Sequence, residues 1–230
     1  MGATAVPLYA STFTLKDFLF MVQGAGITLA LTLLTGAAGT LVGFLVGWAR
    51  TAPARAVTYL LVGYIDVIRS VPLIIQFILL NSFVAILGFP LDPYLSGVIT
   101  LTLYIGGYVA EVVKAGIESV PRNTRRAARG LGLTYLQDFR HIVIPLGAKA
   151  VFPSWVGLML GLMKDTSLIA VLSVTPPELL RASQIIINRL QEPILIFAGA
   201  GAFYFLMCYP LSKLAERLEG RWLARREILR

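Results

Sequence analysis

Residues 24–49 of the chain read GAGITLALTLLTGAAGTLVGFLVGWA, a run of 26 residues without a charged side chain. A helix needs about 20 predominantly apolar residues to cross the hydrocarbon core of a bilayer. Lipid offers the backbone no hydrogen-bond partners, so only helices and closed barrels can span it. The strict alternation of apolar and polar residues that a barrel strand needs is absent from this run. The stretch therefore predicts a membrane-spanning helix.

Three glycines, Gly39, Gly43 and Gly47, recur at intervals of four residues within this run. Small residues at this spacing let helix backbones approach closely in lipid. We expect them to pack against another helix of the same chain; the alternative is a contact with a second subunit.

Four further stretches are apolar enough to act as spans, at residues 71–91, 93–116, 150–175 and 193–212. Residues 56–68, flanked by arginines, predict a helix lying in the membrane interface. The composition agrees, since 57% of the 230 residues are hydrophobic and only 14% are charged, whereas soluble domains carry about a quarter charged residues. The sequence thus predicts an all-α polytopic membrane protein with five transmembrane helices in a single domain, residues 1–230.

Basic residues are unevenly distributed among the loops of this five-span arrangement. Sixteen of the 20 Lys and Arg residues fall on one side, within residues 50–70, residues 114–149 and the tail from Lys213. Loops rich in Lys and Arg remain in the cytoplasm. The sequence therefore predicts an outside N-terminus and a cytoplasmic C-terminus, and topology explains the net charge of +8 without any nucleic-acid binding.

The chain lacks the residue sets of most catalytic and metal sites. It has one cysteine, Cys208, and one histidine, His141, so neither an internal disulfide nor a usual metal-ligand spacing is available. No Walker phosphate loop (Gly-x-x-x-x-Gly-Lys-Ser/Thr) occurs in it. We therefore expect no catalytic residue, metal or cofactor in this chain, and any use of ATP needs a partner.

Charged residues inside the predicted spans are functional candidates because burying charge in a bilayer is costly. Lys164 and Asp165 interrupt the fourth span, and adjacent helical residues point about 100° apart, so they cannot simply neutralise each other. At least one is expected to line a translocation path, with interhelical salt bridges as the alternative. Glu111 and Lys114 are three residues apart and can pair near the inner interface. A structural ion pair is the preferred interpretation of Glu111, and a place in the path is the alternative.

Residues 118–149 form a hydrophilic segment longer than a connection between adjacent helices requires. Residues 123–131 and 136–144 predict two helical pieces separated by glycines, which is a helix–turn–helix on the cytoplasmic face. Composition alone leaves two interpretations open, a docking surface for a partner or a basic loop bound to lipid headgroups.

On the opposite side, residues 175–178 read TPPE and match a capping box with Thr175 as its first residue and Glu178 as its last. They predict a short external helix at about residues 177–188. This helix is a candidate for an external gate or a docking surface, and a plain linker remains the alternative.

The segment 118–149 also resembles the signature loop of bacterial ABC-importer permeases, known as the EAA loop. Its pattern is Glu-Ala-Ala, three residues, Gly, nine residues, Ile, one residue, an apolar residue and Pro. Every interval is matched, by Arg126, Ala127, Ala128, Gly132, Ile142, Ile144 and Pro145. The one departure is Arg126, which stands where the family has Glu.

The remainder, from about Gln23 to Ala215, is similar to the polar-amino-acid branch of these permeases (histidine, glutamine, arginine and glutamate). RSVPL at 69–73, YVAE at 108–111 and KDTSL at 164–168 carry the resemblance. It implies a type I ABC importer permease fold in the bacterial inner membrane, with two identical or homologous permeases around a central path. It further implies that the coupling loop docks on a cytoplasmic ABC ATPase dimer, which binds ATP and Mg, and that an external binding protein delivers a polar amino acid.

By the same resemblance, Asp165 engages the α-ammonium group of the substrate, with Thr166 and Ser167 as hydrogen-bonding neighbours, and transport proceeds by alternating access. Relatives that carry basic substrates can have an acid about two turns earlier, where this chain has Leu158. This favours amide, acidic or other polar amino acids over arginine and lysine.

Two other classes of function compete with this interpretation. An ion-coupled secondary transporter or channel predicts no ATPase partner and leaves the loop spacing unexplained, and the repeats of many secondary transporters are not visible. A membrane-embedded enzyme needs a nucleophile, a base or a metal, and nothing in the sequence assembles one.

Overall fold

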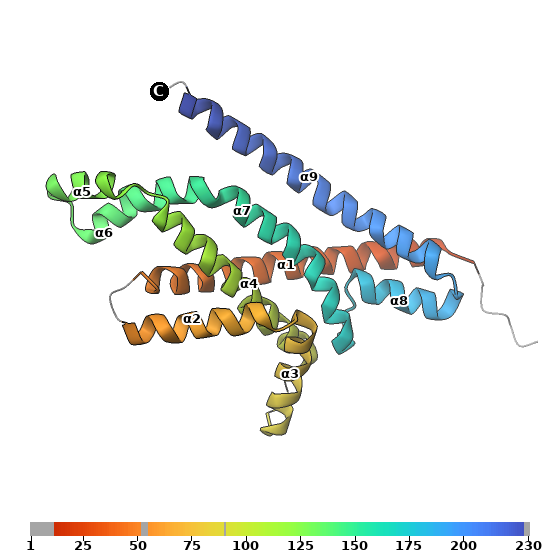
Figure 1. The fold of residues 1–230 in the computed structure, drawn as a ribbon. Coiled ribbons are helices and arrows are strands. Elements are labelled where there is room, and N and C mark those ends of the chain that lie inside the picture. The colour runs from red at the N-terminus through yellow and green to blue at the C-terminus, as the bar shows by residue number, and fades with distance from the viewer. Residues whose placement is uncertain (1–11, 52–54, 90, 228–230) are drawn as a thin grey trace, which may run out of the picture.

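The computed structural model describes residues 12–51, 55–89 and 91–227, and every regular element in these ranges is helical (Figure 1). The first helix, α1, runs from Leu15 to Ala49 and contains the whole apolar run that begins at residue 24. Thr14 is the N-cap residue of this helix, and its backbone N–H and hydroxyl donate to Asp17 Oδ2 at 2.8 and 2.7 Å. Polar capping of this kind satisfies groups that a helix start otherwise leaves unpaired.

Two helices occupy the region of the predicted interface helix and second span. They are α2 (Arg55–Ser70) and α3 (Leu73–Ile86), which meet at 112°. The break falls before Pro72, because a proline disfavours helical backbone in the residue that precedes it. With 14 residues, α3 is about 21 Å long and too short to cross a bilayer core alone. The bounds of α3 therefore differ from those of the predicted span, residues 71–91. Only α2 and α3 together are long enough to cross a bilayer.

Helix α4 (Pro93–Glu118) lies at the centre of the bundle and packs tightly on α1. A Cβ atom at Gly39 would lie 2.0 Å from Ile105 Cγ2, and one at Gly43 would lie 2.6 Å from Val109 Cβ. Only glycine permits this approach, so the prediction that the glycines pack within the chain is confirmed. Tyr64 of α2 donates from its hydroxyl to the backbone oxygen of Leu103 at 2.6 Å, which places α2 on another side of α4.

The predicted helix–turn–helix is formed by α5 (Arg122–Gly130) and α6 (Tyr135–Asp138). The chain then continues without a break through a π-helical turn, η1 (Phe139–Val143), into α7 (Ile144–Asp165) and the 3-10 helix η2 (Thr166–Leu172). This helical run therefore begins well before residue 150, where the fourth span was predicted to begin.

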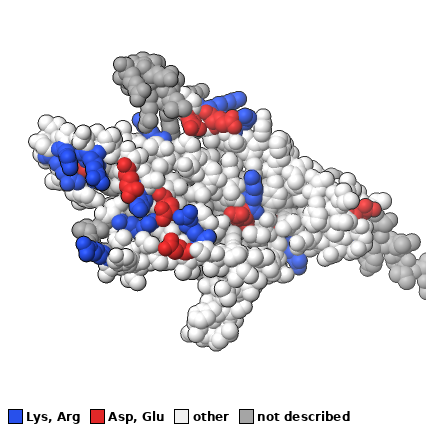
Figure 2. Space-filling view, viewed as in Figure 1, with Lys and Arg blue, Asp and Glu red and all other residues white. Residues whose placement is uncertain are grey.

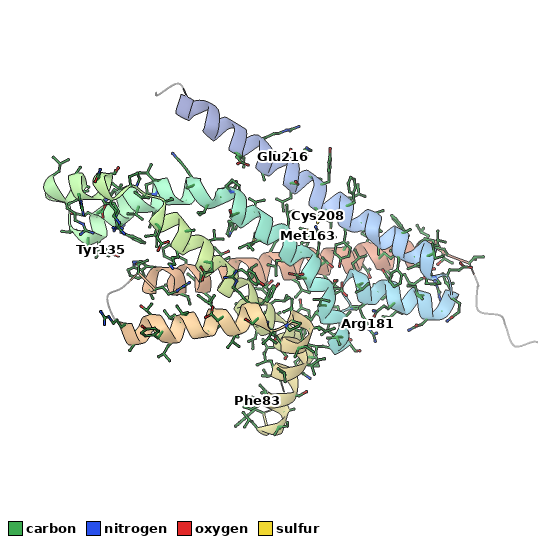
Figure 3. All side chains as sticks on the ribbon, in the orientation of Figure 1. Phe83, Tyr135, Met163, Arg181, Cys208 and Glu216 are labelled. Carbon is green, nitrogen blue, oxygen red and sulfur yellow. The ribbon has the colours of Figure 1, made fainter. Side chains whose placement is uncertain are left out.

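The last two helices are α8 (Leu179–Leu190) and α9 (Pro193–Glu227). Figure 1 shows α5 and α6 at one end of the molecule, which we call the hairpin end, and α8 at the other, which we call the α8 end. Helix α9 starts at the α8 end and diverges from α7 toward its own C-terminus. The two helices meet where Cys208 Sγ lies 3.5 Å from Met163 Sδ (Figure 3).

Within the described residues, four helical segments are long and apolar enough to cross a membrane, or up to five if the bent α2–α3 pair counts as one span. The four are Leu15–Ala49, Pro93–Glu118, Tyr135–Leu172 and Pro193–Gly220. Large apolar side chains are exposed along their outer faces, as expected where the surroundings are lipid. Charged side chains gather toward the hairpin end, while much of the visible surface beyond is uncharged (Figure 2). The fold is thus that of a multi-pass membrane protein.

Candidate functional site

The α5–α6 hairpin is built around a buried carboxylate. Asp138 is fully buried and accepts a hydrogen bond from Arg125 Nε at 3.1 Å, with Arg129 Nε 3.8 Å away. Its other oxygen, Oδ1, has no hydrogen-bond partner among the described residues. Arg125 and Arg129 are four residues apart and so share one face of α5. Asp138 therefore holds the two helices of the hairpin together, a role that the sequence analysis missed.

The turn between α5 and α6 depends on Gly132. Its φ angle is +90°, a backbone conformation that L side chains rarely adopt. On one side of the turn, the backbone N–H of Leu133 donates to the Ala128 oxygen at 3.2 Å. On the other side, Thr134 starts α6, where its backbone N–H donates to Gln137 Oε1 at 2.9 Å. The glycine of the signature pattern is thus required by local geometry before any partner is considered.

The hairpin presents a mixed basic and apolar surface, which we call the hairpin surface. It consists of the exposed residues Arg122, Arg126, Ala127, Leu131, Gly132 and Leu136. Leu131 and Leu136 are 83% and 65% exposed and place two apolar side chains beside the arginines of this surface. Tyr135 lies at the tip (Figure 3), with the Arg129 guanidinium 5.8 Å from the centre of its ring.

Other signature residues connect the hairpin to the bundle. Ala128 is buried, and Ile142 packs on a cluster formed by Ile117, Val120, Phe139 and Val143. Trp48 of α1 faces the Phe139 ring at 5.8 Å between ring centres. Pro145 is the second residue of α7 and directly follows the π-helical turn η1, so the irregular turn coincides with the position where proline cannot donate a helix hydrogen bond. The hairpin surface is therefore connected to α1, α4 and α7 through packed side chains.

Lys164, Asp165, Thr166 and Ser167 lie at the change from α7 to η2, and they face different surroundings. Lys164 is exposed, whereas Asp165 is half-buried and lies near the Tyr104 hydroxyl of α4. Thr166 is fully buried, and its hydroxyl donates to the Met163 oxygen at 2.8 Å, within its own helix. Ser167 contacts the hydroxyl of Tyr204 in α9. The structure thus brings Asp165 to α4 and Ser167 to α9, and turns Thr166 inward.

A row of aromatic and charged side chains continues from Asp165 along α4. The Tyr104 and Tyr108 rings are 5.0 Å apart between centres, and the Arg69 guanidinium lies 5.5 Å from the centre of the Tyr108 ring. The row, which we call the Asp165–Arg69 row, has an acid at one end and a cation at the other. Sequence reasoning missed both tyrosines as site residues, although their spacing of four residues was a signal that they share a face.

Glu111 does not pair with Lys114 as predicted. Its carboxylate accepts a hydrogen bond from Arg50 Nη1 at 2.6 Å, while Lys114 lies 3.9 Å from Glu118. The Arg50 side chain is only 8% exposed, so its charge needs a close partner. The glycine contacts that bring α1 onto α4 also bring Arg50 to Glu111. An ion pair between two helices cannot be predicted from the spacing of residues along one helix. The pair fastens the end of α1 to α4.

No group of three His, Cys, Asp or Glu side chains that could hold a metal ion occurs in the described part of the chain. Apolar spanning helices, a basic hairpin at one end and an isolated acid within the bundle are features of a membrane transport subunit. The class that fold and site define is therefore a polytopic permease. The chain belongs to the family of binding-protein-dependent transport system inner membrane components, which matches residues 39–223.

Known permease proteins are similar in sequence to this chain over most of its length. The glutamine transport system permease protein GlnP of Escherichia coli is 30% identical over 203 residues, which is 87% of this chain and 92% of the relative. The L-cystine transport system permease protein TcyB of Bacillus subtilis is 29% identical and covers 86% and 84% of the two chains. The resemblance predicted from the sequence is thereby confirmed: this is a permease subunit of an ABC importer, and ATP hydrolysis belongs to a separate subunit.

Solved structures show the same fold. A crystal structure of an amino acid ABC transporter with histidines matches with a TM-score of 0.83 and 28% identity, covering 90% of this chain and 95% of the other. An inward-facing structure of the MetNI methionine ABC transporter matches with a TM-score of 0.75 at 18% identity, covering 91% and 99%, and supports the fold alone.

Proposed function

We propose that this chain forms one half of the path of an ATP-driven importer for a polar amino acid. The observation that carries the proposal is the unbroken helical run from Tyr135 to Leu172, which joins the hairpin surface at one end to Asp165 near the other. In this proposal a force applied to the hairpin reaches the candidate substrate site along one continuous helical run. Relatives named for glutamine and cystine transport support an amino acid as the cargo.

The Asp165–Arg69 row supports this class of substrate. A free amino acid carries an ammonium and a carboxylate group, and opposite charges at the two ends of the row complement that pair. In this proposal Asp165 binds the ammonium group, Arg69 attracts the carboxylate, and Tyr104 holds Asp165 in place. Ser167 borders the path. Thr166 lies behind this lining, because its hydroxyl already donates to the Met163 oxygen. Lys164 is exposed on the same helix and adds positive charge beside the acid.

Glu111 is assigned a structural role in this proposal. It lies seven residues beyond Tyr104 on α4, about two helical turns closer to the hairpin end. Its short bond to the nearly buried Arg50 leaves it committed to α1. We therefore keep Glu111 as a fastening point of the bundle and not as a group that meets the substrate.

The proposed partners follow from the two ends of the molecule. The hairpin end, together with the C-terminus, lies in the cytoplasm and docks on an ABC ATPase dimer that binds ATP and Mg. The α8 end, with the N-terminus, faces outward and meets a solute-binding protein. A second permease, identical or homologous, completes the path in the bacterial inner membrane. Exposed Arg122 and Arg126 require carboxylates on the ATPase surface that receives them.

Transport proceeds by alternating access. Closure of the ATPase dimer on ATP draws the two docked hairpins together, and the connected α7 helices tilt so that the Asp165 region opens outward. Hydrolysis and release of the nucleotide reverse the movement. The chain itself supplies binding, a path and mechanical transmission.

The test is uptake by proteoliposomes that contain the complete transporter. The proposal predicts accumulation of radiolabelled glutamine or another polar amino acid only when ATP and the binding protein are both supplied. An ATPase variant that binds but does not hydrolyse ATP should stop uptake. Uptake driven by a proton or sodium gradient without ATP would instead establish the ion-coupled alternative and refute the proposal.

A further inference from the structure

The carboxylate of Glu178 is fully buried where the external helix α8 begins. Its two oxygens accept hydrogen bonds from the backbone N–H groups of Leu180 and Arg181, each at 2.7 Å. Glu178 is thus the N-cap residue itself, whereas the sequence predicted Thr175 in that place. A buried acid that bonds both free N–H groups fixes the direction in which α8 leaves the chain.

Three other elements converge on Glu178. The Tyr204 hydroxyl of α9 donates to Glu178 Oε2 at 3.5 Å, and the Thr28 hydroxyl of α1 accepts from the Leu179 N–H at 3.3 Å. Thr28 of α1 and Ser167 of η2 lie near the Tyr204 hydroxyl, and α8 itself packs on η2. We call Glu178, Thr28, Tyr204 and Ser167 the Glu178 cluster. It joins α8 to α1 and α9 beside η2, and its member Ser167 follows Asp165 by two residues in sequence.

The far end of α8 is fastened as well. Arg189 in its last turn forms an ion pair with Asp17 in the first turn of α1. Beside the Glu178 cluster, the backbones of α1 and α8 are in close contact, since a Cβ atom at Gly24 would lie 3.0 Å from Leu179 Cα. Helices α1 and α8 therefore move together, and the Glu178 cluster is the point where this unit meets η2 and α9.

We propose that Glu178 is a positioning residue for transport, which ties the external helix α8 to η2 and so couples movement at the outer face to Asp165. The inference rests on the proposed function, because it assumes that Asp165 borders the path. Glu178 does not itself touch the substrate. The contacts of Glu178 fix the position of η2, the 3-10 segment that follows Asp165. If these contacts are weakened, α8 moves without η2.

The electrostatics of the cluster provide a separate readout. Burial raises the pKa of Glu178 to about 7, although the N–H groups of Leu180 and Arg181 and the Tyr204 hydroxyl act in the opposite direction. Of the elements packed against it, α9 contributes the titratable Tyr204, α1 and η2 contribute neutral hydroxyls, and α8 contributes Arg181. No described Lys or Arg side chain forms an ion pair with Glu178.

The sign of the pH effect follows from the raised pKa. An unfolded glutamic acid ionises near 4.5, so between pH 4.5 and 7 the folded state binds the proton more tightly. The stabilising contribution of the protonated, buried acid is complete below pH 4.5 and is lost as the pH rises through 7. The cluster should therefore loosen as the pH at the α8 end rises from 6 to 8.

The test compares Glu178→Gln with Glu192→Gln, whose exposed acid lies just before α9, in the complete transporter in proteoliposomes. For Glu178→Gln we expect kcat of ATP-driven uptake to fall about tenfold, because the amide nitrogen of Gln cannot accept a hydrogen bond and one of the two capping bonds from Leu180 and Arg181 is lost. KM for the amino acid should stay within about twofold of wild type. The dependence of uptake on external pH between 6 and 8 should flatten. Glu192→Gln should resemble wild type in all three measurements.

An unchanged kcat and pH profile in Glu178→Gln would overturn the inference, as would a change in KM alone. If Glu178→Gln fails to assemble, Tyr204→Phe decides instead: it removes only the hydroxyl that donates to Glu178 Oε2 beside η2, and it should lower kcat without changing KM. A Tyr204→Phe variant identical to wild type would refute the proposal. Failure of the wild-type complex to take up amino acid with ATP would refute the proposed function instead.

Discussion

Arg125 of α5 donates from its Nε to the buried Asp138 carboxylate of α6 at 3.1 Å, and this bond joins the two halves of the hairpin that carries the signature pattern. Asp138 immediately precedes the π-helical turn that leads into α7. The pair therefore lies between the exposed hairpin surface and the helix that reaches Asp165. A hairpin held in this way has the internal connection that the proposed transmission of force to α7 needs, which a loop lying on lipid headgroups would not need.

Replacing Asp138 by Asn should loosen the hairpin and uncouple it. Loss of hydrogen bonds between charged groups in a buried position costs about 1.5–3 kcal/mol. We expect a lower thermal unfolding midpoint of the purified complex and a loss of substrate-stimulated ATP hydrolysis. Arg125→Lys keeps the charge but not the Nε geometry and should give a smaller loss. Full stimulation in Asp138→Asn would show that hairpin rigidity is dispensable.

Replacing Gly132 by Asp should abolish coupling to ATP hydrolysis while the protein still inserts into the membrane. The exposed turn has φ of +90°, so a side chain both strains the backbone and obstructs a docked surface. Strain of this kind costs about 1–3 kcal/mol. The readout is substrate-stimulated ATPase activity together with the amount of permease in the membrane.

Gly132→Ala and Gly130→Ala separate strain from obstruction. Gly130 ends α5 with open space around it and no positive φ, so its alanine variant should resemble wild type. Gly132→Ala should have an intermediate effect, because it adds strain with little bulk. If Gly132→Asp retained normal stimulated ATPase activity, the turn would have no part in docking.

Replacing Arg126 by Glu should weaken association with the ATPase without changing the stability of the permease. Arg126 is exposed and forms no ion pair among the described residues, so its removal leaves the fold intact. Reversal of a charge at a complementary interface costs several kcal/mol, so we expect affinity to fall by about tenfold or more. Affinity is measured by titrating the ATPase against permease nanodiscs at two salt concentrations. Tighter binding by the Glu variant would mean a basic groove on the ATPase, and Arg126→Lys serves as the control.

Replacing Asp165 by Asn should impair uptake more than assembly. The change removes the charge proposed to bind the ammonium group but retains an acceptor for the Tyr104 hydroxyl. Loss of a charged hydrogen bond to the ligand costs about 1.5–3 kcal/mol, so KM should rise about tenfold or more. Asp66→Asn, an exposed aspartate of α2, is the matched control. Unchanged kinetics in Asp165→Asn would remove this residue from the proposed site.

Replacing Glu111 by Gln should lower stability and leave KM unchanged. The nearly buried Arg50 guanidinium then loses its charged partner, which costs about 1–3 kcal/mol. Lys114→Gln should have little effect, since its contact with Glu118 is long and exposed. Thermal unfolding and uptake kinetics of both variants provide the comparison. A shift in KM at constant stability would return Glu111 to the path.

The spanning helices and the loop pattern can be predicted from short stretches of sequence, because each depends on residues close together in the chain. Apolar length predicts spanning helices, and the structure has four helical segments or a bent fifth that meet that requirement. The spacing of Ala127, Ala128, Gly132 and Pro145 predicted the permease class, which the family match confirms. The glycine of the pattern is predictable because the turn at Gly132 has a positive φ angle, which is a requirement of the backbone alone.

Features that join distant segments could not be predicted in the same way. The partner of Glu111 is 61 residues away, and the enclosure of Glu178 depends on α1 and α9 closing around the start of α8. The Asp165–Arg69 row similarly needs α2, α4 and α7 to meet. Spacing along one helix identifies neighbours on that helix, but the packing of small residues across helices decides which charges face each other.

The most direct test of the central claim is photo-crosslinking from the hairpin surface in living cells. A photoreactive amino acid at Leu131, the most exposed of the hairpin leucines at 83%, should crosslink to the ABC ATPase and should be shielded from membrane-impermeant reagents outside the cell. The same label at Phe83, on the apolar helix α3 away from the hairpin (Figure 3), should give no such product. Crosslinking at Leu131 only to lipid, or labelling of that position from outside, would contradict the account.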